Sequence, residues 1–172
     1  MDAWNFKQLI LPMTDRLYRF ARSILQDGEE AKDAVQELSL KLWEKRNVLD
    51  GVENLQAFAM KSMRNHCLDE IRKRRNTTEP DHVMISEFPE PYEIVEQSDM
   101  SIRIKKLIEK LPELQRTVIQ LRDVEGFEIE EIAKTTGLTA NAVTVNLSRA
   151  RQKIREQILN ENKISERKLW IG

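Results

Sequence analysis

Apolar residues recur every three or four positions along the first 75 residues, the spacing of one face of an α-helix. The helices this predicts are Phe6–Leu25, bending or restarting at Pro12, Glu29–Arg46, and Asn54–Arg75. Gln26-Asp27-Gly28 interrupts the pattern, and Asn47–Glu53 is expected to be a loop. The apolar positions expected to be buried on the third helix are Leu55, Phe58, Ala59, Met63, Cys67 and Ile71.

A second group of helices is predicted after a break. Thr77–Met100 contains three prolines and has no helical period, which is typical of a linker. Helical spacing resumes near Ile102, and Pro112 suits the first turn of a further helix. Two more helices are expected at Glu128–Thr135 and Thr139–Leu159. The prediction is an all-α fold of two small helical domains, 1–76 and 101–160, joined by a linker at 77–100 and followed by a polar tail at 161–172.

The last two predicted helices carry the local signals of a helix-turn-helix. Ala133 is small where two helices cross closely, and Gly137 suits the left-handed conformation that ends a helix. Thr139 can cap the next helix. The outward face expected for that helix carries Asn141, Val145, Ser148, Arg149 and Gln152, with Thr144 and Asn146 on its flanks. Arg and Asn can hydrogen-bond bases there, so this face can read DNA, although an ordinary helical hairpin with a glycine turn is the simpler alternative.

Charge is strongly segregated along the chain although the net charge is only −1. Thr77–Met100 holds seven acidic residues and no Lys or Arg, and without it the net charge is +6. One basic cluster precedes this acidic linker and another follows it at Arg149, Arg151, Lys153 and Arg155. The clusters favour two polyanion-binding units, although basic runs on helices can also be solvated faces. The acidic linker is either a mimic of RNA in a basic channel or a flexible spacer, and its composition does not distinguish these.

Other features narrow the class of protein. The single cysteine, Cys67, excludes an intramolecular disulfide framework and a multi-cysteine zinc site. No window approaches the apolar length of a membrane span and no secretory signal is visible, so the sequence predicts a cytoplasmic protein without membrane insertion. An enzyme using His66, Cys67 and Asp69 is disfavoured because adjacent helical residues point about 100° apart. We therefore expect no catalytic residues, no metal and no cofactor.

Three stretches together resemble a known family. They are Asp27-Gly28-Glu29-Glu30-Ala31-Lys32-Asp33-Ala34-Val35-Gln36-Glu37 with Leu42-Trp43, Phe58-Ala59-Met60-Lys61-Ser62-Met63-Arg64-Asn65 with Asp69 and Arg72, and Leu111-Pro112-Glu113 through to Ser148-Arg149-Ala150-Arg151. In this order they resemble the extracytoplasmic-function (ECF) sigma factors of the sigma-70 family, over nearly the whole chain. The resemblance implies a non-enzymatic promoter-specificity subunit that binds the β′ and β subunits of bacterial RNA polymerase core, promoter DNA and an anti-sigma factor.

The resemblance also implies residue roles. The positions similar to the family's core-polymerase surface are Asp33, Gln36, Glu37 and Leu40. Asn47–Asn54 resembles the loop that captures an extruded base of the −10 element. The positions that correspond to −10 DNA contacts are Lys61, Arg64, Asn65, Arg72 and Lys73. Asn65 has a structural alternative, in which it bonds the loop backbone.

The second unit resembles the domain that reads the −35 element. The corresponding positions are Asn141, Thr144, Val145, Ser148, Arg149, Arg151 and Lys153. Thr144 and Asn146 stand where the family commonly has basic residues, which puts those phosphate contacts in doubt and suggests an unusual −35 sequence. The rival prediction is a stand-alone helix-turn-helix regulator whose N-terminal half is a sensor or dimerisation domain. Such a regulator would not bind core polymerase.

Overall fold

The computed structural model describes residues 2–77 and 98–171, with side chains described for 2–75 and 98–163. The N-terminal unit consists of α1 (Ala3–Ile10), the 3-10 turn η1 (Leu11–Met13), α2 (Thr14–Leu25), α3 (Gly28–Glu44), α4 (Arg46–Leu49) and α5 (Leu55–Thr77). The C-terminal unit consists of α6 (Asp99–Glu109), α7 (Glu113–Ile119), the π-turn η3 (Gln120–Val124), α8 (Ile129–Thr136) and α9 (Ala140–Ile171). The predicted all-α class is confirmed for the described residues, whereas positions 78–97 of the predicted linker lie outside them.

In the N-terminal unit, α2 packs against both α3 and α5, and Leu17 and Phe20 of α2 are completely buried. Pro12 lies in η1 and ends α1, as the sequence indicates. Gln26 takes the left-handed conformation that ends α2, with φ of 58°, and Asp27 then caps α3 by accepting from the Glu30 amide at 2.9 Å. These two residues let the chain reverse between α2 and α3 within a few positions.

Two details of this unit differ from the sequence prediction. The expected loop Asn47–Glu53 begins as the short helix α4, because Leu49 is buried and anchors it. On α5, Phe58 is 39% exposed, whereas Met60, which the pattern did not place on the buried stripe, is buried. The buried stripe of α5 is therefore formed by Ala59, Met60, Met63 and Cys67.

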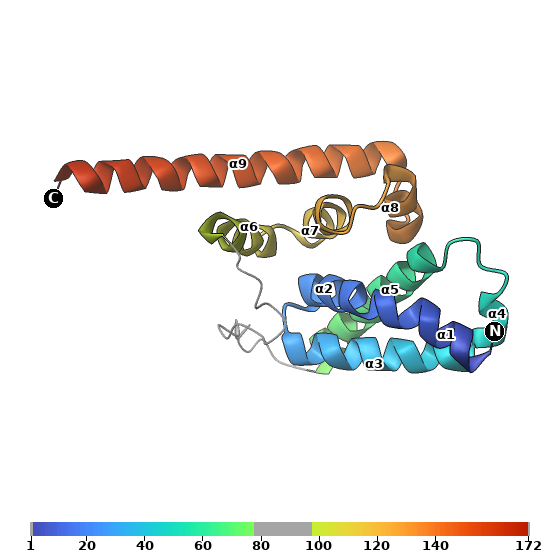
Figure 1. Cartoon of the computed structure of the whole chain (residues 1–172). Coiled ribbons are helices and arrows are strands. Elements are labelled where there is room, and N and C mark those ends of the chain that lie inside the picture. Colours follow the sequence, from blue (N-terminus) through green and yellow to red (C-terminus); the bar gives the residue numbers. More distant parts are fainter. Residues whose placement is uncertain (1, 78–97, 172) are drawn as a thin grey trace.

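The C-terminal unit is held together by α9, which packs against α6, α7 and α8 (Figure 1). The predicted end of this helix at Leu159 is wrong, because α9 continues to Ile171 past the expected tail boundary. No Gly or Pro lies between Ala140 and Ile171 to stop the helix. Arg103 of α6 also donates to Glu161 at 2.8 Å, so α9 has a tertiary partner beyond the predicted end.

The two units are packed against each other. In Figure 1, α7 and α8 lie over the side of the N-terminal unit formed by α2 and α5. The buried apolar residues of both units form one continuous cluster. The structure is thus a closed arrangement of the two predicted domains, which the sequence did not indicate.

Candidate nucleic-acid interface

The helix-turn-helix has the geometry expected from the sequence. Gly137 ends α8 with φ of 75°, and the Thr139 hydroxyl accepts from the Ala142 amide at 3.1 Å to cap α9. Glu128 and Glu131 form a capping box at the start of α8. α8 and α9 are therefore both fixed at the ends that meet the turn.

The outward face of α9 is as predicted in its exposure. Asn141, Val145, Ser148 and Arg149 are exposed, whereas Val143, Leu147 and Ala150 are buried on the opposite side. This face therefore presents amide, methyl, hydroxyl and guanidinium groups to solvent, a set that can read base edges in a major groove.

Two flanking side chains of α9 are bonded to their own helix. The Thr144 hydroxyl donates to the Ala140 carbonyl at 3.0 Å, and the Asn146 amide donates to the Ala142 carbonyl at 2.8 Å. Neither side chain carries a charge, and both already have a partner. This agrees with the expectation that phosphate contacts at positions 144 and 146 are weaker than basic residues would provide.

The basic residues that follow on α9 differ in their partners. Arg151 donates through Nε and Nη2 to the two carboxylate oxygens of Asp123 in η3, at 3.0 and 2.6 Å. This hydrogen bond raises the pKa of Arg151. Lys153 and Arg155 are exposed on the next turn. Arg151 thus links α9 to η3. Of the two predicted −35 contacts Arg151 and Lys153, the lysine is therefore the more available for a phosphate.

The predicted −10 contacts on α5 do not form one exposed set. Lys61 and Asn65 are exposed, but only 14% of the Arg64 side chain is accessible. Arg64 faces α7, where its Nη2 lies 3.7 Å from a Glu113 carboxylate oxygen, and its Nε is buried without a hydrogen-bond partner. The C-terminal unit therefore covers one of the five predicted contacts.

The other two predicted contacts lie further along α5 and pair within the helix. Arg72 contacts Asp69 at 2.9 Å, and Lys73 contacts Glu70 at 2.6 Å. The hydrogen bond between Lys73 and Glu70 raises the pKa of the lysine and lowers that of the glutamate. Both cations are exposed, so DNA phosphates can compete for them.

The loop before α5 is braced by Asn54 rather than by Asn65. The Asn54 side chain accepts from the Ala57 amide at 2.9 Å and donates to Glu131 of α8 at 2.7 Å. No described hydrogen bond joins Asn65 to the loop, so the structural alternative for Asn65 has no support among the described contacts. The loop predicted to capture a base is therefore tied to the helix-turn-helix in this arrangement.

The candidate protein-binding face lies on α3, away from the C-terminal unit (Figure 1). Asp33, Gln36, Glu37 and Leu40 are all exposed, and Leu40 is 63% exposed. The buried residues of α3 include Ala34 and Leu38, on the other side of the helix. The four predicted residues thus share a face on which an exposed leucine is surrounded by polar groups.

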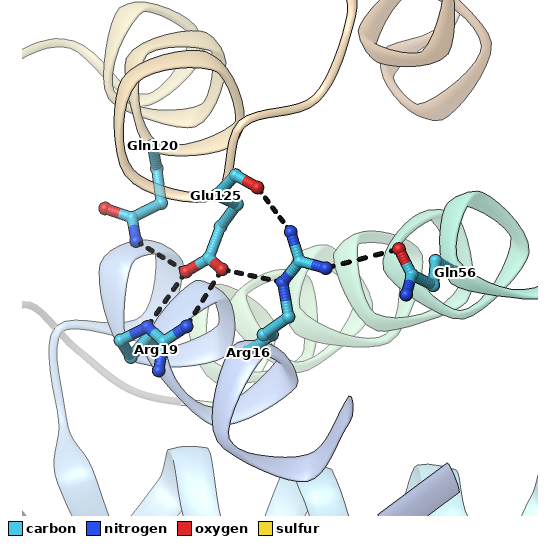
Figure 2. Close-up of polar contacts among 5 residues, drawn as sticks. All are labelled: Arg16, Arg19, Gln56, Gln120 and Glu125. Atoms are coloured by element: carbon cyan, nitrogen blue, oxygen red, sulfur yellow. Dashed lines mark hydrogen bonds and ion pairs between the residues drawn. The ribbon is translucent and has the colours of Figure 1, made fainter. Parts of the chain in front are cut away.

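Sequence reasoning missed a polar cluster between the units, shown in Figure 2. Its centre is Glu125, whose side chain is 1% exposed and accepts hydrogen bonds from Arg16 and Arg19 of α2. The signal available in the sequence was the break Val124-Glu125-Gly126-Phe127, which holds an acidic residue before a glycine. The arginine partners are 106 and 109 residues away, so no local pattern could reveal them.

The trio proposed as an alternative enzyme site lacks a reactive thiol. Cys67 is completely buried, and burial raises the pKa of its thiol to about 12. Within the described side chains, no three His, Cys, Asp or Glu residues gather as metal ligands. Among the described helices, none is both long and apolar enough to cross a bilayer.

Comparison with protein families assigns both units. A model described as Sigma-70 region 2 matches residues 9–77, and one described as Sigma-70, region 4 matches residues 101–154. The ECF RNA polymerase sigma factor SigE of Mycolicibacterium smegmatis is 26% identical over 92% of this chain, which spans 62% of that relative's length. The RNA polymerase sigma factor SigV of Bacillus subtilis is 28% identical over 90% of this chain and 93% of its own length.

Solved structures show a similar arrangement. The sigma factor RpoE of Bartonella quintana, in a complex with the anti-sigma factor NepR, superposes with a TM-score of 0.74 and 28% identity over 90% of this chain and 96% of its own. CnrH, in a complex with the cytosolic domain of CnrY, has a TM-score of 0.67 at 23% identity, over 91% of this chain and 89% of its own, which supports the fold alone. Since both units match in the same order in sequence and in structure, the chain belongs to the sigma-70 family, as a sigma factor of the ECF type.

Proposed function

We propose that this chain is a promoter-specificity subunit that binds bacterial RNA polymerase core and directs it to promoters with particular −10 and −35 elements. The observation that carries the proposal is that sigma region 2 and region 4 both match, in order, on a chain with an exposed DNA-reading face on α9. The chain performs no catalysis itself, because the polymerase supplies nucleotidyl transfer. Its place of action is therefore that of the polymerase, in the cytoplasm.

The division of roles follows the two units. The α3 face with Leu40 docks on the β′ subunit, since an exposed apolar side chain ringed by polar groups is typical of a protein-binding surface. The α5 face with Lys61 and Asn65, and the loop that ends at Asn54, bind the melted −10 strand. The α9 face with Arg149 reads the −35 duplex.

Two weak DNA-binding modules gain specificity when a larger body fixes their separation. Core polymerase supplies that constraint in the proposal, so promoter selection depends on the spacing between the two elements. An anti-sigma factor is the expected inhibitor, since the similar sigma factor RpoE was solved in a complex with the anti-sigma factor NepR.

The decisive experiment is transcription from a library of randomised promoters by bacterial core polymerase with and without this chain. Sequencing of the transcribed templates should show enriched −10 and −35 motifs at a fixed spacing only when the chain is present. Pull-down of core polymerase by the full chain separates this function from a stand-alone regulator, which predicts no binding. Absence of any promoter-dependent transcript would refute the proposal.

A further inference from the structure

One buried titratable side chain of the N-terminal unit, His66 of α5, takes no part in the surfaces described above. Only 9% of its side chain is exposed, because the ring lies between α5 and α3. Nδ1 lies 3.4 Å from Nζ of Lys41, and Nε2 lies 3.5 Å from Oε2 of Glu37, both residues of α3. The two polar atoms of the ring are therefore both turned toward charged groups of the neighbouring helix.

Hydrogen-bonding chemistry decides which ring nitrogen carries the proton. An ammonium group has no acceptor, so the contact with Lys41 requires Nδ1 of His66 to accept. The proton of a neutral imidazole then lies on Nε2, the nitrogen that faces Glu37. The ring thus turns an acceptor toward the cation and a donor toward the carboxylate, and the two contacts reinforce each other.

The carboxylate that meets this donor belongs to the face of α3 proposed to bind core polymerase. The Glu37 side chain is 56% exposed, and Lys41, one turn later, places Nζ 3.6 Å from the same Oε2 atom that His66 meets. Within the described contacts, Oε1 is left for a partner. A surface carboxylate without such neighbours loses rotamer entropy when a partner orders it, so a carboxylate held in advance binds at a lower cost.

The next acidic residue on α5 does not replace Glu37 as the partner of the ring. Glu70, one turn after His66, interacts with it electrostatically, but its Oε1 accepts from Nζ of Lys73 at 2.6 Å. The charge of Glu70 is therefore engaged along its own helix. The contact across the two helices is the one between His66 and Glu37.

We propose that His66 is a positioning residue for polymerase binding, which holds the Glu37 carboxylate through Nε2–H in the orientation that core polymerase meets. This deepens the proposed function and rests on it. The group of the polymerase that Glu37 accepts from is a hydrogen-bond donor, such as a guanidinium or an ammonium. A side chain of α5 thereby supports a binding face that lies on α3.

The test measures the dissociation constant between the full chain and core polymerase, without DNA. His66→Leu removes both ring nitrogens and keeps an apolar side chain, whereas His66→Gln retains an amide N–H as a donor toward Glu37. Both variants are also made in a Glu37→Gln chain, which completes a double-mutant cycle. Tyr18→Leu is the matched control, because it replaces another half-buried ring of the same unit, on α2, whose hydroxyl has no hydrogen-bond partner.

Contacts of this length at a half-exposed carboxylate are individually weak, so His66→Leu should weaken core binding by about threefold. His66→Gln and Tyr18→Leu should match the natural sequence. In the Glu37→Gln chain, His66→Leu should cause no further weakening, because the group that it positions is already changed. Circular dichroism establishes that each variant retains its helices.

Nuclear magnetic resonance of the free chain gives a second readout that does not depend on polymerase. A spectrum correlating the ring nitrogens with the ring carbon-bound protons distinguishes a protonated from an unprotonated nitrogen, and the His66 signals are those lost in His66→Gln. The neutral ring should be protonated at Nε2 and unprotonated at Nδ1. A ring that only fills space between the helices has no reason to adopt one tautomer.

Three results would overturn the positioning role: equal weakening by His66→Leu in the natural and the Glu37→Gln chains, no rescue by His66→Gln, or a neutral ring protonated at Nδ1. Failure of the proposed function is distinguishable, because the natural sequence itself would then not bind core polymerase. That result would overturn the positioning role as well, since Glu37 would have no polymerase to meet.

Discussion

Replacing Leu40 with alanine tests whether the outer face of α3 binds core polymerase. Leu40 is 63% exposed in the free chain, so a partner that covers it removes most of its surface from water. Alanine lacks three of the leucine side-chain carbons, each worth about 0.8 kcal/mol on full burial. Scaled to the exposed fraction, the loss is about 1.5 kcal/mol, which corresponds to roughly tenfold weaker binding.

The substitution should leave folding unchanged, because the side chain is on the surface and alanine favours helix. The assay is the dissociation constant between the full chain and core polymerase, measured without DNA so that promoter contacts do not contribute. Met100→Ala provides the matched control, since Met100 is 44% exposed on α6 and its truncation removes as many heavy atoms.

A Leu40→Ala chain that binds core within twofold of the natural sequence would refute the assignment of the α3 face. Equal weakening by Leu40→Ala and Met100→Ala would refute it as well, because the effect would then reflect general loss of apolar surface. Tenfold weakening by Leu40→Ala alone is the result expected from the structure.

Three further predictions concern the turn, the DNA-reading helix and the buried thiol. Gly137→Ala should lower the free energy of unfolding by about 1–2 kcal/mol, because φ of 75° strains any residue with a Cβ. Gly51→Ala is the control and should cost less, since Gly51 does not have a positive φ. Urea unfolding measures both variants. Arg149→Ala should relax sequence preference at one −35 position in a duplex-binding selection, while Lys153→Ala should leave the preference intact and reduce the log–log salt slope by about 0.9. Burial raises the pKa of the Cys67 thiol from its ordinary value of 9.0 to about 12 in the folded chain. The contribution of the protonated thiol to stability is therefore complete below about pH 9 and is lost as the pH rises toward 12. Cys67→Ala should lack this part of the pH dependence of unfolding. If the free energy of unfolding of Cys67→Ala differed from that of the natural sequence by the same amount at every pH, the thiol prediction would be contradicted.

Much of the local structure could be predicted because its causes are local. The Gln26-Asp27-Gly28 break, the end of α8 at Gly137 and the Thr139 cap depend on residues a few positions apart, and each is confirmed. The outward face of α9 follows from helical periodicity, so the exposure of Asn141 and Arg149 was predictable too. Family resemblance added the order and roles of the two units, which no single helix reveals.

Other features were decided by tertiary contacts. Periodicity placed Phe58 on the buried stripe of α5, but the packing of the neighbouring helices leaves that edge exposed and buries Met60 at the other edge. The two side chains point about 200° apart because they are two residues apart on the helix. The end of α9 was predicted at Leu159 because the following residues are polar. The helix continues to Ile171, since no Gly or Pro interrupts it and Arg103 pairs with Glu161.

The sequence by itself therefore determined two helical units, a helix-turn-helix with an exposed polar face, and a family. Only the tertiary structure decided that the units close on each other, that Arg64 and Asn54 meet the C-terminal unit, and that Glu125 lies between Arg16 and Arg19. The physical reason is the distance along the sequence over which each interaction acts. Caps and periodicity act within one or two helical turns, whereas a buried ion pair between residues more than a hundred positions apart depends on how whole units pack.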